Sequence, residues 1–195
     1  MSENENSELE EMQEEELSEE QIPQPPAELR VVGLYGDITE KKAEEVTYAL
    51  LLMENEGPEP IEIYISSSGG SANDMFAIYD VMRSIRGAAT LSTVGMGKVM
   101  SAAVLLLAAG TKGKRKIGKY CRVMLHCVSS GTSGSIHDIK SEMGEIQYTQ
   151  DQYIEVLEEE TNLTKKQIKD IFSRNVNTYL TAEEAVEYGI ADEVI

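Results

Sequence analysis

Two residues able to cooperate in nucleophilic catalysis, Ser101 and His126, lie 25 positions apart in this sequence. Ser101 opens a predicted apolar helix, Ser101–Ala109, at the positive end of the helix dipole. Backbone N–H groups there can stabilise an oxyanion. His126 ends the predicted strand Arg122–Leu125, from which it can reach a neighbouring helix N-terminus as a general base. Plainer interpretations remain open, namely a serine that caps its helix and a histidine with a structural role.

A glycine-rich loop, Ser66–Gly70, joins a predicted strand to a predicted helix. Paired glycines allow the backbone to approach a ligand closely and to turn an N–H group towards it. An ordinary turn is the alternative. A phosphate-binding loop is disfavoured, because no Lys-Ser or Lys-Thr pair follows the glycines at Walker spacing.

Other side chains near Ser101 are weaker candidates. Lys98, three residues before it, would give a Ser–Lys pair, but a lysine in a turn is usually solvated. Cys127 adjoins His126, but neighbouring residues on a strand point to opposite faces, so the two are not expected to pair. His137, in a polar segment, is predicted to face solvent.

Strand-like and helix-like patterns alternate from Arg30 onward. Such repeats predict parallel strands joined by right-handed crossovers, and hence an α/β fold. A turn is expected at residues 95–97, between a strand and the helix of Ser101. The predicted strands are 30–35, 61–65, 90–94, 116–117 and 122–125, and the predicted helices span 39–53, the region from Met75 to Met82, 101–109, 135–160, the stretch after Thr164, and 181–188.

Composition excludes several classes of protein. The net charge is −18, and residues 1–26 hold ten of the acidic residues and no Lys or Arg, so a basic nucleic-acid-binding face is not expected. This acidic tail is predicted to be disordered, with docking to a basic partner as the alternative. No secretory signal or membrane span is visible, and two cysteines suit a reducing compartment, so we expect a cytoplasmic protein.

Several strings of the sequence, in order, resemble the ClpP family of Clp protease proteolytic subunits. The similarity covers about residues 30–195, and the distance between Ser101 and His126 is the same as in the family. The similar strings are YISSSGG at 64–70, IYD at 78–80, MGKVMSAA at 96–103, LLAAG at 106–110, TKGKR at 111–115, RVMLH at 122–126 and LTAEEAVEYG at 180–189.

The resemblance implies a crotonase-like α/β fold with a protruding handle helix, in a peptidase domain spanning 30–195 after a disordered tail over 1–29. The handle region would cover about 133–175. The resemblance also implies a homo-oligomer of heptameric rings, stacked in pairs as a tetradecamer. It further implies polypeptide substrates and an AAA+ unfoldase as partner. No cofactor or metal is expected.

By position, the resemblance makes Ser101 the nucleophile and His126 the base, with the oxyanion held by the backbone N–H groups of Gly70 and Ala102. The segments after Gly70 and after His126 would hold the substrate as an added strand. Asn177 falls where the family has the third triad residue, an Asp. An Asn can orient an imidazole but supplies no charge, and Asp170 is a candidate substitute.

The sequence also departs from the family near the surfaces that would meet the unfoldase. The family's N-terminal axial segment and first helix are replaced by the acidic tail, Glu62 stands where an aromatic residue is usual, and Ser68 replaces a proline. The leading hypothesis is a serine endopeptidase that works through an acyl-enzyme. The alternatives are a catalytically impaired, structural or regulatory ring subunit and, on the same fold, an acyl-CoA enzyme.

Overall fold

Strands and helices alternate along the chain in a computed structural model that describes residues 30–131, 133–174 and 176–195. The predicted tail over 1–29 therefore lies outside the described residues. The strands are β1 (Arg30–Tyr35), β2 (Ile61–Ser67), β3 (Leu91–Met100), β4 (Arg115–Ile117), β5 (Arg122–Leu125), β6 (Thr178–Leu180) and β7 (Glu193–Val194). The helices are α2 (Glu40–Glu56), α3 (Ala72–Ile85), α4 (Ala102–Ala108), α5 (Ile136–Glu160), α6 (Lys165–Ser173) and α7 (Ala182–Glu187).

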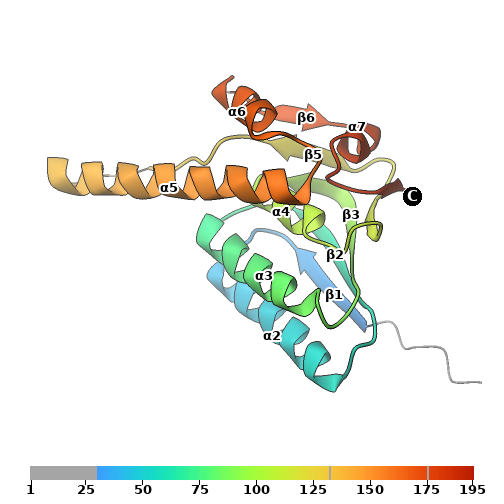
Figure 1. Ribbon diagram of the computed structural model, residues 1–195. Coiled ribbons are helices and arrows are strands. Elements are labelled where there is room, and N and C mark those ends of the chain that lie inside the picture. The colour runs from blue at the N-terminus through green and yellow to red at the C-terminus, as the bar shows by residue number, and fades with distance from the viewer. Residues whose placement is uncertain (1–29, 132, 175) are drawn as a thin grey trace, which may run out of the picture.

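The strands form one sheet that forks at β3 (Figure 1). The main path runs β1-β2-β3-β4-β7 with all pairs parallel, as crossover helices require. Residues 93–95 of β3 pair with β4, whereas residues 98–100 pair with β5, and β6 adds to β5 antiparallel. The turn predicted at 95–97 is wrong, because β3 continues through it. Gly97, with a φ of 66°, accommodates the change of partner that a side chain would resist.

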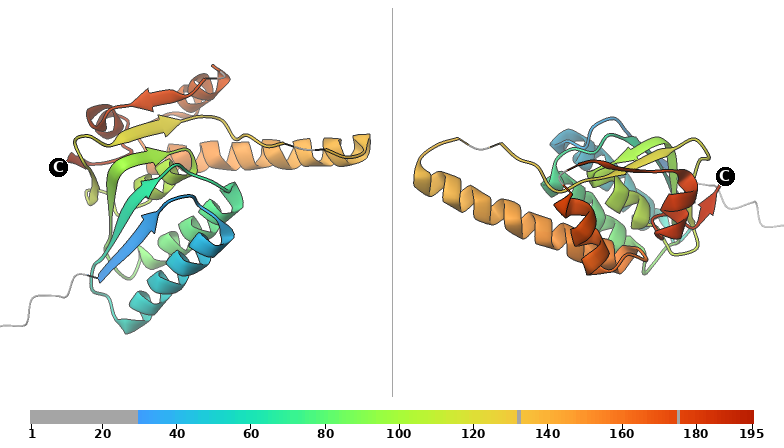
Figure 2. Two further views of the ribbon diagram at one scale, coloured as in Figure 1. Left: turned by 180° about the vertical axis from the view of Figure 1, so that it is seen from behind. Right: turned by 90° about the horizontal axis from the view of Figure 1, so that it is seen from above.

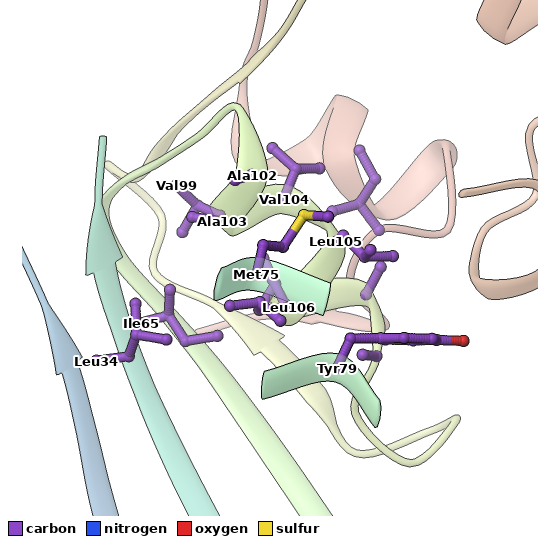
Figure 3. Close-up of a cluster of buried hydrophobic side chains, with 14 of the residues drawn as sticks. Leu34, Ile65, Met75, Tyr79, Val99, Ala102, Ala103, Val104, Leu105 and Leu106 are labelled. Atoms are coloured by element: carbon purple, nitrogen blue, oxygen red, sulfur yellow. The ribbon is translucent and has the colours of Figure 1, made fainter. Parts of the chain in front are cut away.

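Helix α4 packs against β3, α3 and α5. Figure 3 shows its side chains in one buried cluster with Ile65, Met75 and Tyr79. Every residue from Ala102 to Ala108 is buried. Because the helix is apolar all round, it is stable only when it is enclosed on every side. No helix in the described ranges is both long and apolar enough to cross a membrane.

Helix α5 projects far beyond the body of the molecule (Figures 1 and 2). Its buried residues, Tyr153, Ile154, Leu157 and Glu160, all lie in its C-terminal part. The projecting part exposes apolar side chains, those of Ile136, Met143 and Tyr148. The predicted α/β fold with a protruding handle helix is thus confirmed.

Candidate active site

Ser101 stands between the end of β3 and the start of α4 with an unusual backbone. Its φ of 54° and ψ of −127° make it the one residue other than glycine with a positive φ in the described part of the chain. Such a conformation costs about 1–3 kcal/mol and occurs most often at functional sites. Ser101 does occupy the N-cap position, but its side chain makes no capping hydrogen bond. Helix capping therefore does not explain this serine.

His126 is brought to Ser101 by strand pairing. Strand β5 pairs with the last residues of β3, with Met124 opposite Met100, so the next residues of both strands emerge side by side. The Nε2 atom of His126 lies 2.7 Å from the Oγ atom of Ser101. Burial lowers the pKa of His126 below its ordinary value of 6.5, so the imidazole is neutral at pH 7 and can accept the serine proton.

The loop at Gly69 and Gly70 packs closely against Ser101 and the segment at Ile38. A Cβ atom added to Gly69 would lie 2.7 Å from the Cβ of Ser101, and one added to Gly70 would lie 2.2 Å from the carbonyl oxygen of Ile38. Both glycines have positive φ values, 94° and 151°. Within the described residues, the N–H groups of Gly70 and Ala102 have no hydrogen-bond acceptor. Both residues line the pocket beside Ser101, so these N–H groups are available to an oxyanion.

A pocket of about 150 Å³ opens beside the serine and the histidine. It is lined by Gly70, Ser71, Ala72, Met75, Ser101, Ala102, His126, Cys127, Val128, Ser129 and Tyr153. A second groove of about 370 Å³ shares Ser71, Ala72, Val128 and Ser129 with it. The N–H of Val128 donates to Oε1 of Gln150 at 2.6 Å, which ties one wall to α5. The two hollows therefore adjoin each other along these shared residues.

The other predicted partners of His126 do not contact it. The antiparallel ladder of β5 and β6 ends with Leu125 opposite Thr178, so His126 and Asn177 are the next residues beyond it on the two strands. Nevertheless Asn177 is exposed, and no hydrogen bond joins it to His126 within the described residues. Asp170 is also exposed and makes no such bond. Across the described ranges, the imidazole has no carboxylate partner.

The alternative arrangements around the serine gain no support. The Nζ atom of Lys98 donates to Oγ of Ser68 at 2.7 Å, and no hydrogen bond in the described ranges links it to Ser101. Strand β5 ends at Leu125, so the strand alternation expected to separate Cys127 from His126 does not extend to them. Both residues line the pocket, although no hydrogen bond between described atoms joins them.

Sequence reasoning did not identify Tyr153 as part of the site. Its hydroxyl donates to the carbonyl oxygen of Ser101 at 3.0 Å, and its ring forms part of the pocket wall. In the sequence it belongs to the buried stripe of α5 with Ile154 and Leu157, a pattern that predicts core packing only. The contact spans 52 positions, so only the fold reveals it.

A serine hydroxyl within hydrogen-bonding distance of an imidazole, with backbone N–H groups beside it that have no acceptor among the described residues, is the arrangement expected of a serine hydrolase on an α/β fold. The Clp protease family matches residues 15–195, and the chain belongs to this family. The chain is 38% identical over 167 residues to an ATP-dependent Clp protease proteolytic subunit 4 of Rhodococcus jostii, covering 85% of this chain and 84% of the relative. It is 37% identical over 169 residues to a proteolytic subunit 1 of Corynebacterium glutamicum, covering 86% and 79%. The predicted family and enzyme class, a serine-type endopeptidase, are thereby confirmed.

Proposed function

We propose that this chain cleaves polypeptides through an acyl-enzyme, with Ser101 as nucleophile and His126 as general base. The observation that carries the proposal is the 2.7 Å contact between Nε2 of His126 and Oγ of Ser101. It is supported by the positive φ of Ser101, which aims the side chain out of the turn into the pocket. A general base must lie within hydrogen-bonding distance of the proton it removes, and this one does.

The reaction proceeds in two halves. Oγ of Ser101 attacks the peptide carbonyl carbon while His126 takes the hydroxyl proton, and the N–H groups of Gly70 and Ala102 donate to the oxyanion. The intermediate then breaks the C–N bond, His126 gives its proton to the leaving amine, and the acyl group stays on Ser101 as an ester. Water, deprotonated by His126, hydrolyses that ester and restores the free serine.

Substrate binds in this proposal as an extended strand in the cleft between the residues after Gly70 and those after His126. Their backbone would hold any sequence by main-chain hydrogen bonds. The lining of the pocket supports this, since Ser71, Ala72, Val128 and Ser129 border both hollows.

We further propose that the subunit works in a chamber of heptameric rings stacked in pairs and fed by an AAA+ unfoldase in the cytoplasm. The relatives are named proteolytic subunits of ATP-dependent proteases, which implies larger assemblies for them. The projecting part of α5 exposes Ile136, Met143 and Tyr148, apolar surface suited to contact between rings. Both cysteines, Cys121 and Cys127, are free, as in a reducing compartment.

A second candidate function is a catalytically impaired ring subunit with a structural role. The exposed Asn177 favours it, because the imidazolium would lack a carboxylate to stabilise it. The two candidates differ in whether Ser101 is an activated nucleophile in the assembled protein. That difference is directly measurable.

A fluorophosphonate probe and a fluorogenic peptide decide between them. The wild type is expected to be labelled and to cleave the peptide, whereas Ser101→Ala and His126→Ala abolish both. Sedimentation should show the same assembly for all three proteins, because neither side chain packs in the core.

Two substitutions on the surface serve as matched controls. Ser84 is exposed on α3 and His137 is exposed at the start of α5, so Ser84→Ala and His137→Ala should leave labelling and turnover unchanged. An assembled wild type that is neither labelled nor active would overturn the peptidase and establish the structural subunit.

A further inference from the structure

The peptide unit between Ser101 and Ala102 carries two functions at once. In a planar trans peptide the C=O and N–H groups point in opposite directions. The N–H of this peptide unit belongs to Ala102 and is a proposed donor to the oxyanion. The C=O of the same unit belongs to Ser101. Whatever holds the carbonyl oxygen therefore also sets the direction of the oxyanion donor.

Two groups hold that carbonyl oxygen. The N–H of Val104 donates to it at 3.0 Å from within the first turn of α4, and the hydroxyl of Tyr153 donates to it at 3.0 Å from α5. The preceding peptide is fixed separately, since the N–H of Ser101 donates to the carbonyl oxygen of Met124 at 2.8 Å. These bonds maintain a backbone that a serine would not otherwise adopt.

Tyr153 is itself held firmly. Its side chain is buried, and its ring stacks on that of Phe172 with centroids 5.9 Å apart and an interplanar angle of 4°. Burial raises the pKa of the Tyr153 hydroxyl, which therefore stays protonated and remains a donor. A rigid ring at the base of α5 thus presents a single hydroxyl to the nucleophile's own carbonyl group.

We propose that Tyr153 is a positioning residue of the active site, whose hydroxyl orients the Ser101–Ala102 peptide so that the Ala102 N–H points into the oxyanion hole. This inference rests on the proposed peptidase function. It assigns to α5 a part in catalysis, through the bond from the Tyr153 hydroxyl to the carbonyl oxygen of Ser101. Loss of the hydroxyl should weaken transition-state binding while leaving ground-state binding of the peptide intact.

Tyr153→Phe removes the hydroxyl and keeps the ring. We expect kcat for a fluorogenic peptide to fall about tenfold, with KM changed less than about twofold. Loss of a whole oxyanion donor costs about 10²–10³ in kcat. Here the donor remains and Val104 still holds the carbonyl oxygen, so the loss is smaller. Affinity for a matching peptide trifluoromethyl ketone, whose adduct with serine carries an oxyanion, should fall by the same factor as kcat.

Tyr79→Phe is the matched control. Tyr79 is a second buried tyrosine with a buried hydrogen bond, from its hydroxyl to Glu160 at 2.9 Å, but it does not line the pocket. It should lower the melting temperature and leave kcat and inhibitor affinity unchanged. If Tyr153→Phe behaves in the same way, Tyr153 is structural and the inference is overturned. A wild type without turnover or labelling would overturn the proposed function, and this inference with it.

Discussion

Two buried polar clusters lie two turns apart on the same face of α5, and they are built differently. At Tyr153 the helix meets Ser101 and His126, which we call the nucleophile cluster. At Glu160 it meets Tyr79 and Arg86, which we call the ion cluster. The Glu160 carboxylate accepts bonds of 2.9 Å from Tyr79 and of 2.8 and 2.6 Å from Arg86.

The ion cluster is satisfied, whereas the nucleophile cluster is left incomplete. Burial alone would raise the pKa of Glu160, but the hydrogen bonds from Arg86 and Tyr79 outweigh it, and the pKa is lowered. Within the described ranges, His126 has no charged hydrogen-bond partner that would offset the effect of its burial. Burial therefore lowers the pKa of His126. One cluster therefore stabilises the base of α5. In the proposed function, the other keeps the strained Ser101 and its neighbouring N–H groups available to a substrate.

Disrupting the ion cluster should lower the free energy of unfolding and leave kcat unchanged. Glu160→Gln leaves the Arg86 guanidinium without a counter-charge, and we expect a loss of about 2–3 kcal/mol in the free energy of unfolding, reduced because Arg86 keeps some contact with water. The melting temperature, followed by circular dichroism at fixed protein concentration, should fall by roughly 5–10 °C.

The control for this change is Glu159→Gln, which removes the same charge from an exposed position of the same helix. It should shift the melting temperature by less than about 2 °C. Equal melting temperatures for the two variants would show that the ion cluster does not stabilise the fold. A fall in kcat without a fall in stability would show that the two clusters are not separate.

The nucleophile cluster and the fold were predictable to different extents. Regular alternation of strand and helix patterns predicted the α/β architecture, and the local context of Ser101 and His126 predicted both as candidates. The extension of β3 through residues 95–97 was not predicted, because glycines usually mark turns and the pairing of β3 with β5 is non-local. Tyr153 was missed for the same reason, since its role depends on a contact with Ser101 across the fold.

Asn177 offers a way to complete the nucleophile cluster. Because Asn177 and His126 are the next residues beyond the ladder of β5 and β6, Asn177→Asp would bring a carboxylate towards the imidazole. We expect kcat/KM for the fluorogenic peptide to rise about tenfold. In a serine protease whose triad carboxylate is buried, replacing Asp by Asn lowers kcat by about 10⁴. The gain expected here is far smaller, because position 177 is exposed and water screens the new charge.

Asp170→Asn tests the other carboxylate that the sequence suggested, and it should leave kcat/KM unchanged because Asp170 is exposed on α6 without a bond to His126 in the described ranges. A fall in that variant would identify Asp170 as the missing partner. Unchanged activity in Asn177→Asp would mean that position 177 does not act on the imidazole in the assembled protein.

The pH dependence of kcat/KM separates the two clusters, because His126 is expected to titrate in the range where Glu160 stays ionised. A general base must be neutral, so activity is present above the pKa of His126 and is lost as pH falls through it. Burial lowers that pKa, so the acidic midpoint of kcat/KM should lie below 6.5. Glu160, with its pKa below 4.5, stays ionised over this range, so the midpoint reports the base and not unfolding. In Asn177→Asp the midpoint should move upward, because a nearby carboxylate favours the imidazolium. A wild-type midpoint at or above 6.5, with circular dichroism unchanged over the same range, would show that His126 already has an anionic partner.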